Sequence, residues 1–201
     1  MTSAAPQTPP GRKPGRPRST EADEAILAAT LELLLEDGYR ALTMEAVRAR
    51  SGVGKATLYR RFGSKEELVA SAVRHLHQDL AAPDTGSLRG DYEAISAAVL
   101  AAARSSNAPL LMPRLLAEST GNPELHRIFF ENLVRPRRAA LLEIVRRAVE
   151  RGELRDDLDS ELVVDVLTGP HIYRLLISGG DVEQLVRPAK LLELITRGIA
   201  R

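Results

Sequence analysis

The fold is decided by residues 43–62, Thr-Met-Glu-Ala-Val-Arg-Ala-Arg-Ser-Gly-Val-Gly-Lys-Ala-Thr-Leu-Tyr-Arg-Arg-Phe. This stretch predicts a short helix with Thr43 as its N-cap, a tight turn at Gly52, and a second short helix from Lys55 to Arg61. The apolar residues that can pack inward and fix the angle between the helices are Ala46, Val47, Val53, Leu58 and Phe62. The residues left outside are Lys55, Thr57, Tyr59, Arg60 and Arg61. Such cations and hydroxyls suit contacts to phosphates and base edges, whereas the alternative is an ordinary helical hairpin with a polar surface.

Charge is distributed unevenly along the chain. Its 201 residues include 28 Lys and Arg and 27 Asp and Glu, so the net charge is only +1. Six basic residues nevertheless lie between Ala46 and Lys65 without one acid. Residues 1–19 hold four basic residues, five prolines and no acid, which predicts a flexible basic arm. A basic N-terminal part on a neutral-to-acidic body indicates a nucleic-acid-facing end, unless it is only a solvated face with a mobile tail.

Capping signals and apolar periodicity predict helices along the rest of the chain. The expected spans are 20–37, 64–80, 91–105, an irregular start at Pro109–Pro113 leading to Ser119, 122–151 with a kink at Pro136, 159–180 interrupted at Gly169–Pro170, and 181–200. No segment alternates as a strand would, so the predicted fold class is all-α. The predicted domains are the arm (1–19), a three-helix helix-turn-helix domain (20–66) and a helical body (67–201).

Several protein classes are disfavoured by composition. The chain has no cysteine, no apolar run of the ~20 residues that a membrane span needs, and no apolar stretch behind its basic N-terminus. Phosphate-loop, zinc-protease and serine-hydrolase motifs are absent, and the histidines do not form a metal pair. We therefore expect a cytoplasmic protein that is not an enzyme and has no membrane, metal or cofactor partner.

A longer set of motifs carries a family resemblance. The matching segments are 25–29, 37–39, 43–47, 52–62 and 63–68. With them, residues 20–80 resemble the DNA-binding domain of the TetR/AcrR family of bacterial transcriptional regulators. The resemblance implies that Thr43 and Lys65 contact phosphates of double-stranded DNA and that Tyr59 contacts its backbone. It also implies that Lys55, Thr57 and Arg60 face bases or nearby phosphates, with Arg48 and Arg61 as further candidates.

The arm contains a second, shorter resemblance. Gly15-Arg16-Pro17-Arg18 resembles the core of an AT-hook, in which an extended Arg-Pro segment lies in the minor groove of A·T-rich DNA. Arg16 and Arg18 would then enter that groove. The alternative is a basic tail that only aids solubility.

The family resemblance also implies what the body does. Members pair through their last two helices, which predicts a homodimer through residues 160–178 and 182–199, with seam candidates Val163, Val166, Leu167, Tyr173, Leu191 and Leu194. An effector pocket is expected among the middle helices, lined by Leu111, Met112, Leu115, Phe129, Phe130 and Leu133, with Tyr92, Arg114 and His126 as polar points. For both sets the alternative is ordinary helical core. The implied function is a repressor that a mainly hydrophobic small molecule releases from a pseudo-palindromic operator, and the alternative is an architectural DNA-binding protein without an effector.

Overall fold

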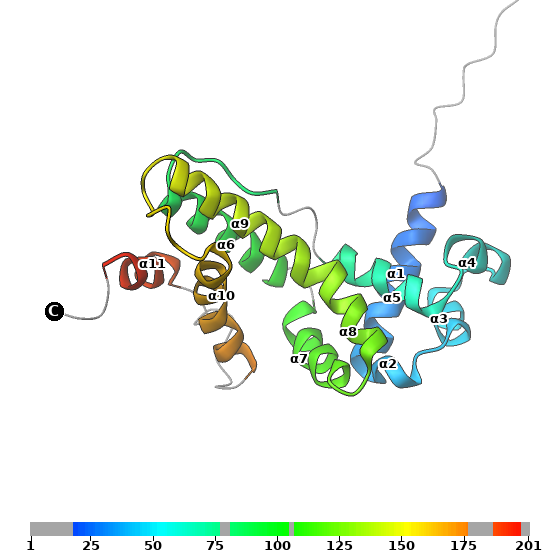
Figure 1. The fold of residues 1–201 in the computed structure, drawn as a ribbon. Helices are drawn as coiled ribbons and strands as arrows, with labels where there is room; N and C mark the ends of the chain where they lie inside the picture. The colour runs from blue at the N-terminus through cyan, green and yellow to red at the C-terminus, as the bar shows by residue number, and fades with distance from the viewer. Residues whose placement is uncertain (1–17, 77–80, 105–106, 177–186, 198–201) are drawn as a thin grey trace, which may run out of the picture.

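The computed structural model consists of helices joined by short turns (Figure 1). It describes residues 18–76, 81–104, 107–176 and 187–197, and no strand occurs in these ranges, in agreement with the predicted all-α class. The predicted features at Arg16, Leu80, Gly179–Gly180, Asp181 and Ala200 lie outside them. The elements are α1 (Arg18–Glu36), α2 (Gly38–Ala41), α3 (Met44–Ser51), α4 (Lys55–Arg61), α5 (Lys65–His75), α6 (Leu88–Arg104), α7 (Ala108–Ser119), α8 (Pro123–Phe129), the π-helical turn η1 (Phe130–Val134), α9 (Arg135–Glu150), α10 (Ser160–Leu176) and α11 (Pro188–Arg197).

The predicted helix ends are made by local capping groups. The side chain of Thr43 accepts a hydrogen bond from the backbone N–H of Ala46 and opens α3. Ser64 does the same for Glu67 at α5, and Asn122 does so for Leu125 at α8. Each of these bonds satisfies one backbone donor that a helix N-terminus leaves without a partner. These N-caps were predicted from the sequence and are confirmed.

Where a kink was expected at Pro136, the structure has a π-helical turn, η1, directly before α9. Proline has no N–H to donate, and its ring crowds the carbonyl four residues earlier. The helix responds by widening for one turn, so that the N–H of Arg135 bonds to the carbonyl of Phe130, five residues back. α8 and α9 therefore follow each other along one long rod (Figure 1).

The helices differ from the sequence expectation in several details. α6 begins at Leu88 instead of residue 91, α7 is helical from Ala108 without an irregular start, and α11 begins at Pro188 within the expected span 181–200. α1 begins at Arg18, inside the predicted arm, and α2 is an extra helical turn directly after α1. The expected interruption of α10 at Gly169–Pro170 is wrong, because the helix continues to Leu176. The hydroxyl of Tyr92 lies 2.9 Å from both the Leu167 carbonyl and the His171 ring, one on each side of that pair, and so connects the two halves of α10.

The interior consists of two apolar clusters. The first joins the N-terminal helices to the body and contains residues of α1 to α5 together with Leu111, Leu115, Leu125, Ile128 and Leu133. The second lies among α6, α9, α10 and α11 around Ile144 and Val164. The predicted domain boundary between residues 66 and 67 falls inside α5, which packs in the first cluster along its length. The N-terminal helices α1 to α5 and the adjacent part of the body therefore share one core.

Candidate DNA-binding interface

The helix-turn-helix is held by a few buried side chains. Val47 of α3 and Leu58 of α4 are completely buried, and Phe62 closes the C-terminal end of α4. All three belong to the first apolar cluster, which also contains the inner face of α1. Gly52 forms the turn with a φ of 69°, a conformation that costs a residue with a Cβ about 1–2 kcal/mol. The angle between α3 and α4 is thus fixed from inside.

The outer face of α4 carries the predicted contact residues. Lys55, Tyr59 and Arg60 are exposed and Thr57 is half-buried. The ammonium of Lys55 lies 5.8 Å from the centre of the Tyr59 ring, so these two side chains occupy neighbouring positions on the surface. Two cations, a hydroxyl and a phenol on one short helix provide donors for phosphate oxygens and for base edges in a major groove.

Two arginines of the basic stretch pair with acidic residues of α1. The Arg61 side chain is only 17% exposed and its guanidinium is paired with Asp23 of α1, so the expectation that it faces outward is wrong. Arg50 of α3 bonds to Glu36 at 2.7 Å and to Glu32 at 3.2 Å, both on α1. The hydrogen bonds from Arg50 lower the pKa of Glu36. These pairs attach the helix-turn-helix to α1.

The two candidates on α3 lie at opposite ends of it, Thr43 at the N-cap and Arg48 in the last turn. Thr43 uses its oxygen as the N-cap acceptor, and its hydroxyl proton can still be donated to a phosphate. Arg48 bonds to Glu45 on the same helix, with the Nε to Oε1 distance at 2.7 Å. Because both of these side chains are exposed, the pair is weak and can open when a phosphate approaches.

Lys65 begins α5 next to α4. Its ammonium lies 4.3 Å from the centre of the Tyr39 ring, within the range of a cation–π interaction. Burial lowers the pKa of Lys65 from its ordinary value. The Tyr39 ring is itself almost fully buried, and burial together with the neighbouring Glu66 raises the pKa of its phenol to about 12. The Lys65 ammonium therefore lies over the face of a neutral aromatic ring.

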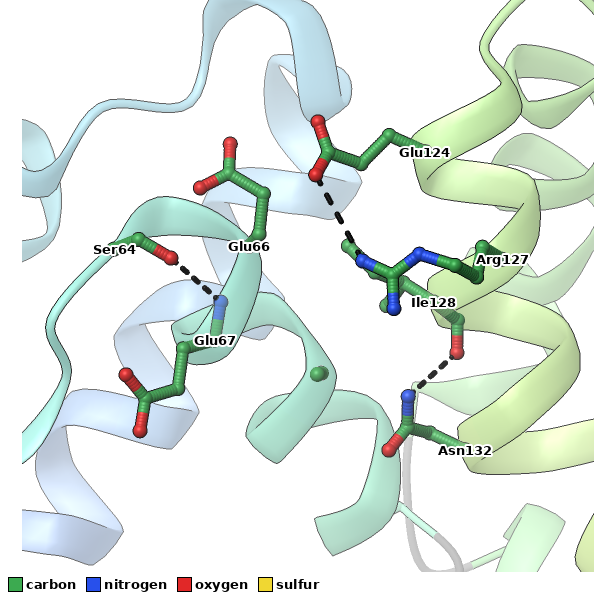
Figure 2. Close-up of a pocket in the computed structure, with 8 residues that line it drawn as sticks. Ser64, Glu66, Glu67, Glu124, Arg127, Ile128 and Asn132 are labelled. Carbon is green, nitrogen blue, oxygen red and sulfur yellow. Dashed lines mark hydrogen bonds and ion pairs between the residues drawn. The ribbon is translucent and has the colours of Figure 1, made fainter.

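A polar cleft of about 390 Å³ lies where α5 meets α8 (Figure 2). Its lining residues are Ser64, Glu66, Glu67, Ala70, Glu124, Arg127, Ile128 and Asn132. Arg127 pairs with Glu124 across 3.8 Å, and Asn132 donates to the carbonyl of Ile128. None of the predicted effector residues lines this cleft, so it is a feature of the junction between the two parts.

The structure divides the predicted effector residues instead of gathering them. Leu111, Leu115 and Leu133 are buried in the first apolar cluster, with Met112 and Phe129 packed against it. Tyr92 lies in the second cluster, apart from the others. Phe130 is largely exposed and stacks on His126, with ring centres 6.4 Å apart. Arg114 turns toward α1, where it donates to the Leu35 carbonyl at 2.6 Å.

The predicted seam residues divide as well. Val166 and Tyr173 of α10 and Leu194 of α11 are exposed by 42%, 60% and 50%. Leu162 and Ile172 of α10 are exposed too, although they were not predicted. Val163 and Leu191 are half-buried. Leu167 is the exception, because it is buried in the second cluster and its side chain cannot form part of an outer face.

Sequence reasoning missed the residues that join α7 to the DNA-facing end. The carboxylate of Glu118 accepts a hydrogen bond from the backbone N–H of Tyr39 at 2.8 Å, and Arg114 bonds to Glu118 at 3.2 Å. The i, i+4 spacing of Arg114 and Glu118 on a predicted helix indicates an ion pair, but nothing in the sequence places that pair beside Tyr39.

The described part of the chain shows neither a group of side chains suited to a metal ion nor a helix long and apolar enough to cross a membrane. The fold and its exposed α4 define a helix-turn-helix DNA-binding protein. Residues 26–72 match the family model of bacterial regulatory proteins, tetR family, and residues 82–201 match the tetracyclin repressor-like C-terminal domain. The chain belongs to the TetR family of bacterial transcriptional regulators.

Individual proteins support this assignment over most of the chain. YdeS of Bacillus subtilis, named an uncharacterized HTH-type transcriptional regulator, is 33% identical over 171 residues, which are 85% of this chain and 86% of YdeS. The DNA-binding transcriptional repressor TetR of Mycobacteroides abscessus is 30% identical over 166 residues, 81% of this chain and 86% of that protein. The structure of FadR from Bacillus subtilis in complex with stearoyl-CoA has the same fold, with a TM-score of 0.69 at 18% identity over 88% of this chain and 99% of FadR.

Proposed function

We propose that this regulator is a repressor that binds a pseudo-palindromic operator as a homodimer and is released from it by a small-molecule effector. The observation that carries the proposal is the outer face of α4, where Lys55, Thr57, Tyr59 and Arg60 stand on a helix fixed from inside by Leu58. A dimer would present two such helices to two half-sites about one helical turn or more apart. An occupied operator is closed to the transcription machinery, and a related protein is named a repressor.

The DNA contacts divide by role in this proposal. Thr43, Tyr59 and Lys65 hold phosphates and set the register of the protein on the duplex. Thr57 and Arg60 read base edges. Lys55 and Arg48 add phosphate contacts at the ends of α4 and α3. Arg16 of the arm and Arg18, the first residue of α1, add contacts in the neighbouring minor groove.

The homodimer would form through α10 and α11. Val166, Tyr173 and Leu194, joined by Leu162 and Ile172, leave apolar side chains in water when the chain is alone. A second copy of the same surface would bury them, and an isologous contact of this kind closes into a dimer. Tyr173→Glu is expected to shift the protein toward the monomer in light scattering after size exclusion, because it buries a charge in the contact. Leu110→Glu, an equally exposed apolar position on α7, is the matched control and should remain dimeric.

The effector would be a mainly hydrophobic molecule. Met112, Phe129, Phe130 and the buried leucines of α7 would supply an apolar lining once these helices separate, with Arg114 and His126 at its margins, whereas Tyr92 belongs to the second cluster. The stearoyl-CoA in the FadR structure makes long-chain acyl-CoA a reasonable first probe. Each bound effector that prefers the released conformation 100-fold lowers operator affinity by at most 100-fold, about 2.7 kcal/mol. A thermal-shift screen of apolar ligands with no stabilising compound would contradict this part.

A selection from randomised DNA at near-physiological salt tests the central claim. An enriched inverted repeat is the expected result, and its spacing would give the separation of the two α4 helices. Enrichment of A·T-rich DNA without symmetry would instead favour the second candidate, an architectural DNA-binding protein without an effector. That candidate rests on Gly15-Arg16-Pro17-Arg18, and the ratio of specific to non-specific affinity distinguishes the two.

A further inference from the structure

Tyr39 connects the body of the protein to the start of α5. It is 6% exposed and lies in α2, the extra turn after α1. Its backbone N–H donates to Glu118 of α7 at 2.8 Å. Its hydroxyl lies 3.5 Å from Glu66, and its ring lies below the ammonium of Lys65. One residue thus contacts a body helix on one side and a predicted phosphate-binding residue on the other.

The connection on the body side is tightly held. Glu118 accepts from Arg114 on the same helix, and Arg114 also donates to the carbonyls of Leu35 and Glu36 at the end of α1. Gly38 has a φ of 81°, and a Cβ placed there would lie 2.3 Å from the Glu118 carboxylate. A side chain at position 38 would therefore require the Glu118 and Arg114 side chains to move. α7 cannot shift along α1 without breaking at least one of these hydrogen bonds.

The ring has a definite effect on Lys65. A lysine side chain loses considerable rotamer entropy when its ammonium is fixed. In an ordinary phosphate contact this entropy is lost on binding and weakens the affinity. The negative face of an aromatic ring attracts the ammonium and restricts it beforehand. The other charged groups around Tyr39 are Glu66 on α5 and Glu124 and Arg127 on α8. Glu66 and Glu118 both favour the charged form of Lys65.

We propose that Tyr39 is a positioning residue for DNA binding: its ring places the Lys65 ammonium for a phosphate contact, and Glu118 of α7 holds Tyr39 in that place. The proposal rests on the proposed function and adds a route from the body to the DNA. A movement of α7 that withdraws the Glu118 carboxylate releases the α2 backbone, moves the ring, and weakens the Lys65 contact in each half-site.

The test measures operator affinity as a function of salt for the full-length protein. Lys65→Ala removes one phosphate contact per half-site, so the slope of log K against log salt should fall by about two for the dimer. Tyr39→Leu should lower affinity by about 3-fold per half-site, which is about 10-fold for the dimer, and should reduce the slope in the same direction. Tyr39→Phe keeps the ring and should retain both the wild-type affinity and the wild-type slope.

A double-mutant cycle separates positioning from a general structural effect. In the Lys65→Ala background, Tyr39→Leu should have no further effect on DNA binding, because its only route to the DNA is gone. In the Arg60→Ala background it should keep its full 10-fold effect, because Arg60 lies on α4. Additive effects of Tyr39→Leu and Lys65→Ala would overturn the proposal, and so would an unchanged salt slope in folded Tyr39→Leu.

The α7 side is tested at Glu118, which is partly exposed. Glu118→Ala should reduce affinity and slope like Tyr39→Leu, whereas Glu118→Gln retains an acceptor for the Tyr39 N–H and should keep most of both. If Tyr39→Leu does not fold, the cycle between Glu118→Ala and Lys65→Ala decides in its place, with additivity as the contrary result. The wild-type protein separates this test from the proposed function: wild-type binding with additive variants refutes only the positioning role, whereas no wild-type operator refutes the regulator.

Discussion

Gly38→Ala provides a quantitative test of the close contact between α7 and the end of α1. A residue with a Cβ at a φ of 81° costs about 1–2 kcal/mol of conformational energy. The new Cβ would also lie 2.3 Å from the Glu118 carboxylate, which must therefore turn away. Turning it away loses the hydrogen bond to Tyr39, and such a bond to a charged group contributes about 1.5–3 kcal/mol. We expect Gly38→Ala to lower the free energy of unfolding by about 2.5–5 kcal/mol.

Gly52→Ala is the matched control for this prediction. Gly52 has a similar φ of 69°, but a Cβ there meets no atom within 4 Å. Gly52→Ala should lower the free energy of unfolding by the conformational energy alone, about 1–2 kcal/mol. Urea unfolding of both variants at one fixed protein concentration gives the comparison, since a dimer would make stability depend on concentration. Equal destabilisation of the two variants would refute the claim that Glu118 occupies a fixed position against Gly38.

Three further predictions concern the DNA face and the two cores. Arg60→Ala should relax base preference at one operator position by about 1–3 kcal/mol, whereas Tyr59→Phe should weaken binding to all DNA sequences alike. Identical profiles of the two variants in a randomised-site selection would contradict this division. Leu58→Ala should lower the free energy of unfolding by about 2–5 kcal/mol, measured in urea, because Leu58 is completely buried, and a loss below 1 kcal/mol would argue against that packing. Burial raises the pKa of Asp91, but hydrogen bonds from Thr85 and Arg151 outweigh it and leave the pKa lowered. The contribution of Asp91 to the free energy of unfolding should therefore be complete above the unfolded pKa of about 3.9 and be lost as the pH falls through the folded pKa. The free energy of unfolding of Asp91→Asn should depend less on pH below about 4 than that of the wild type.

The helix-turn-helix could be predicted because its signals are local. Thr43, Ser64 and Asn122 each cap a helix through a backbone N–H three residues ahead, so the relevant groups are neighbours in the sequence. The outward position of Lys55 and Arg60 followed from the same short-range periodicity, and the structure places both on the surface. Arg61 shows where this reasoning ends, since its partner Asp23 comes from another helix.

The errors concern features that tertiary contacts decide. Gly169 and Pro170 weaken a helix on their own, but the Tyr92 hydroxyl bonds on both sides of them and the helix continues. The contact between Glu118 and Tyr39 joins residues 79 positions apart, which no local pattern announces. Leu167 and Val166 are adjacent apolar residues of one helix, yet one is buried and the other exposed. Only the packing of α10 on α6 and α9 separates them.

The π-helical turn η1 has a consequence for the orientation of the two ends of the molecule. One extra residue in a helix turns everything beyond it by about 100° about the axis. α8 directs Leu125 and Ile128 into the first apolar cluster, whereas α9 directs Ile144 and Ala148 into the second. The extra residue thus sets the angular phase between the end that carries α4 and the end that carries α10 and α11. Removal of a single residue from this turn would leave each cluster with its own side chains but would rotate one end of the molecule against the other. A dimer assembled through α10 and α11 would then present its α4 helices to DNA in the wrong direction.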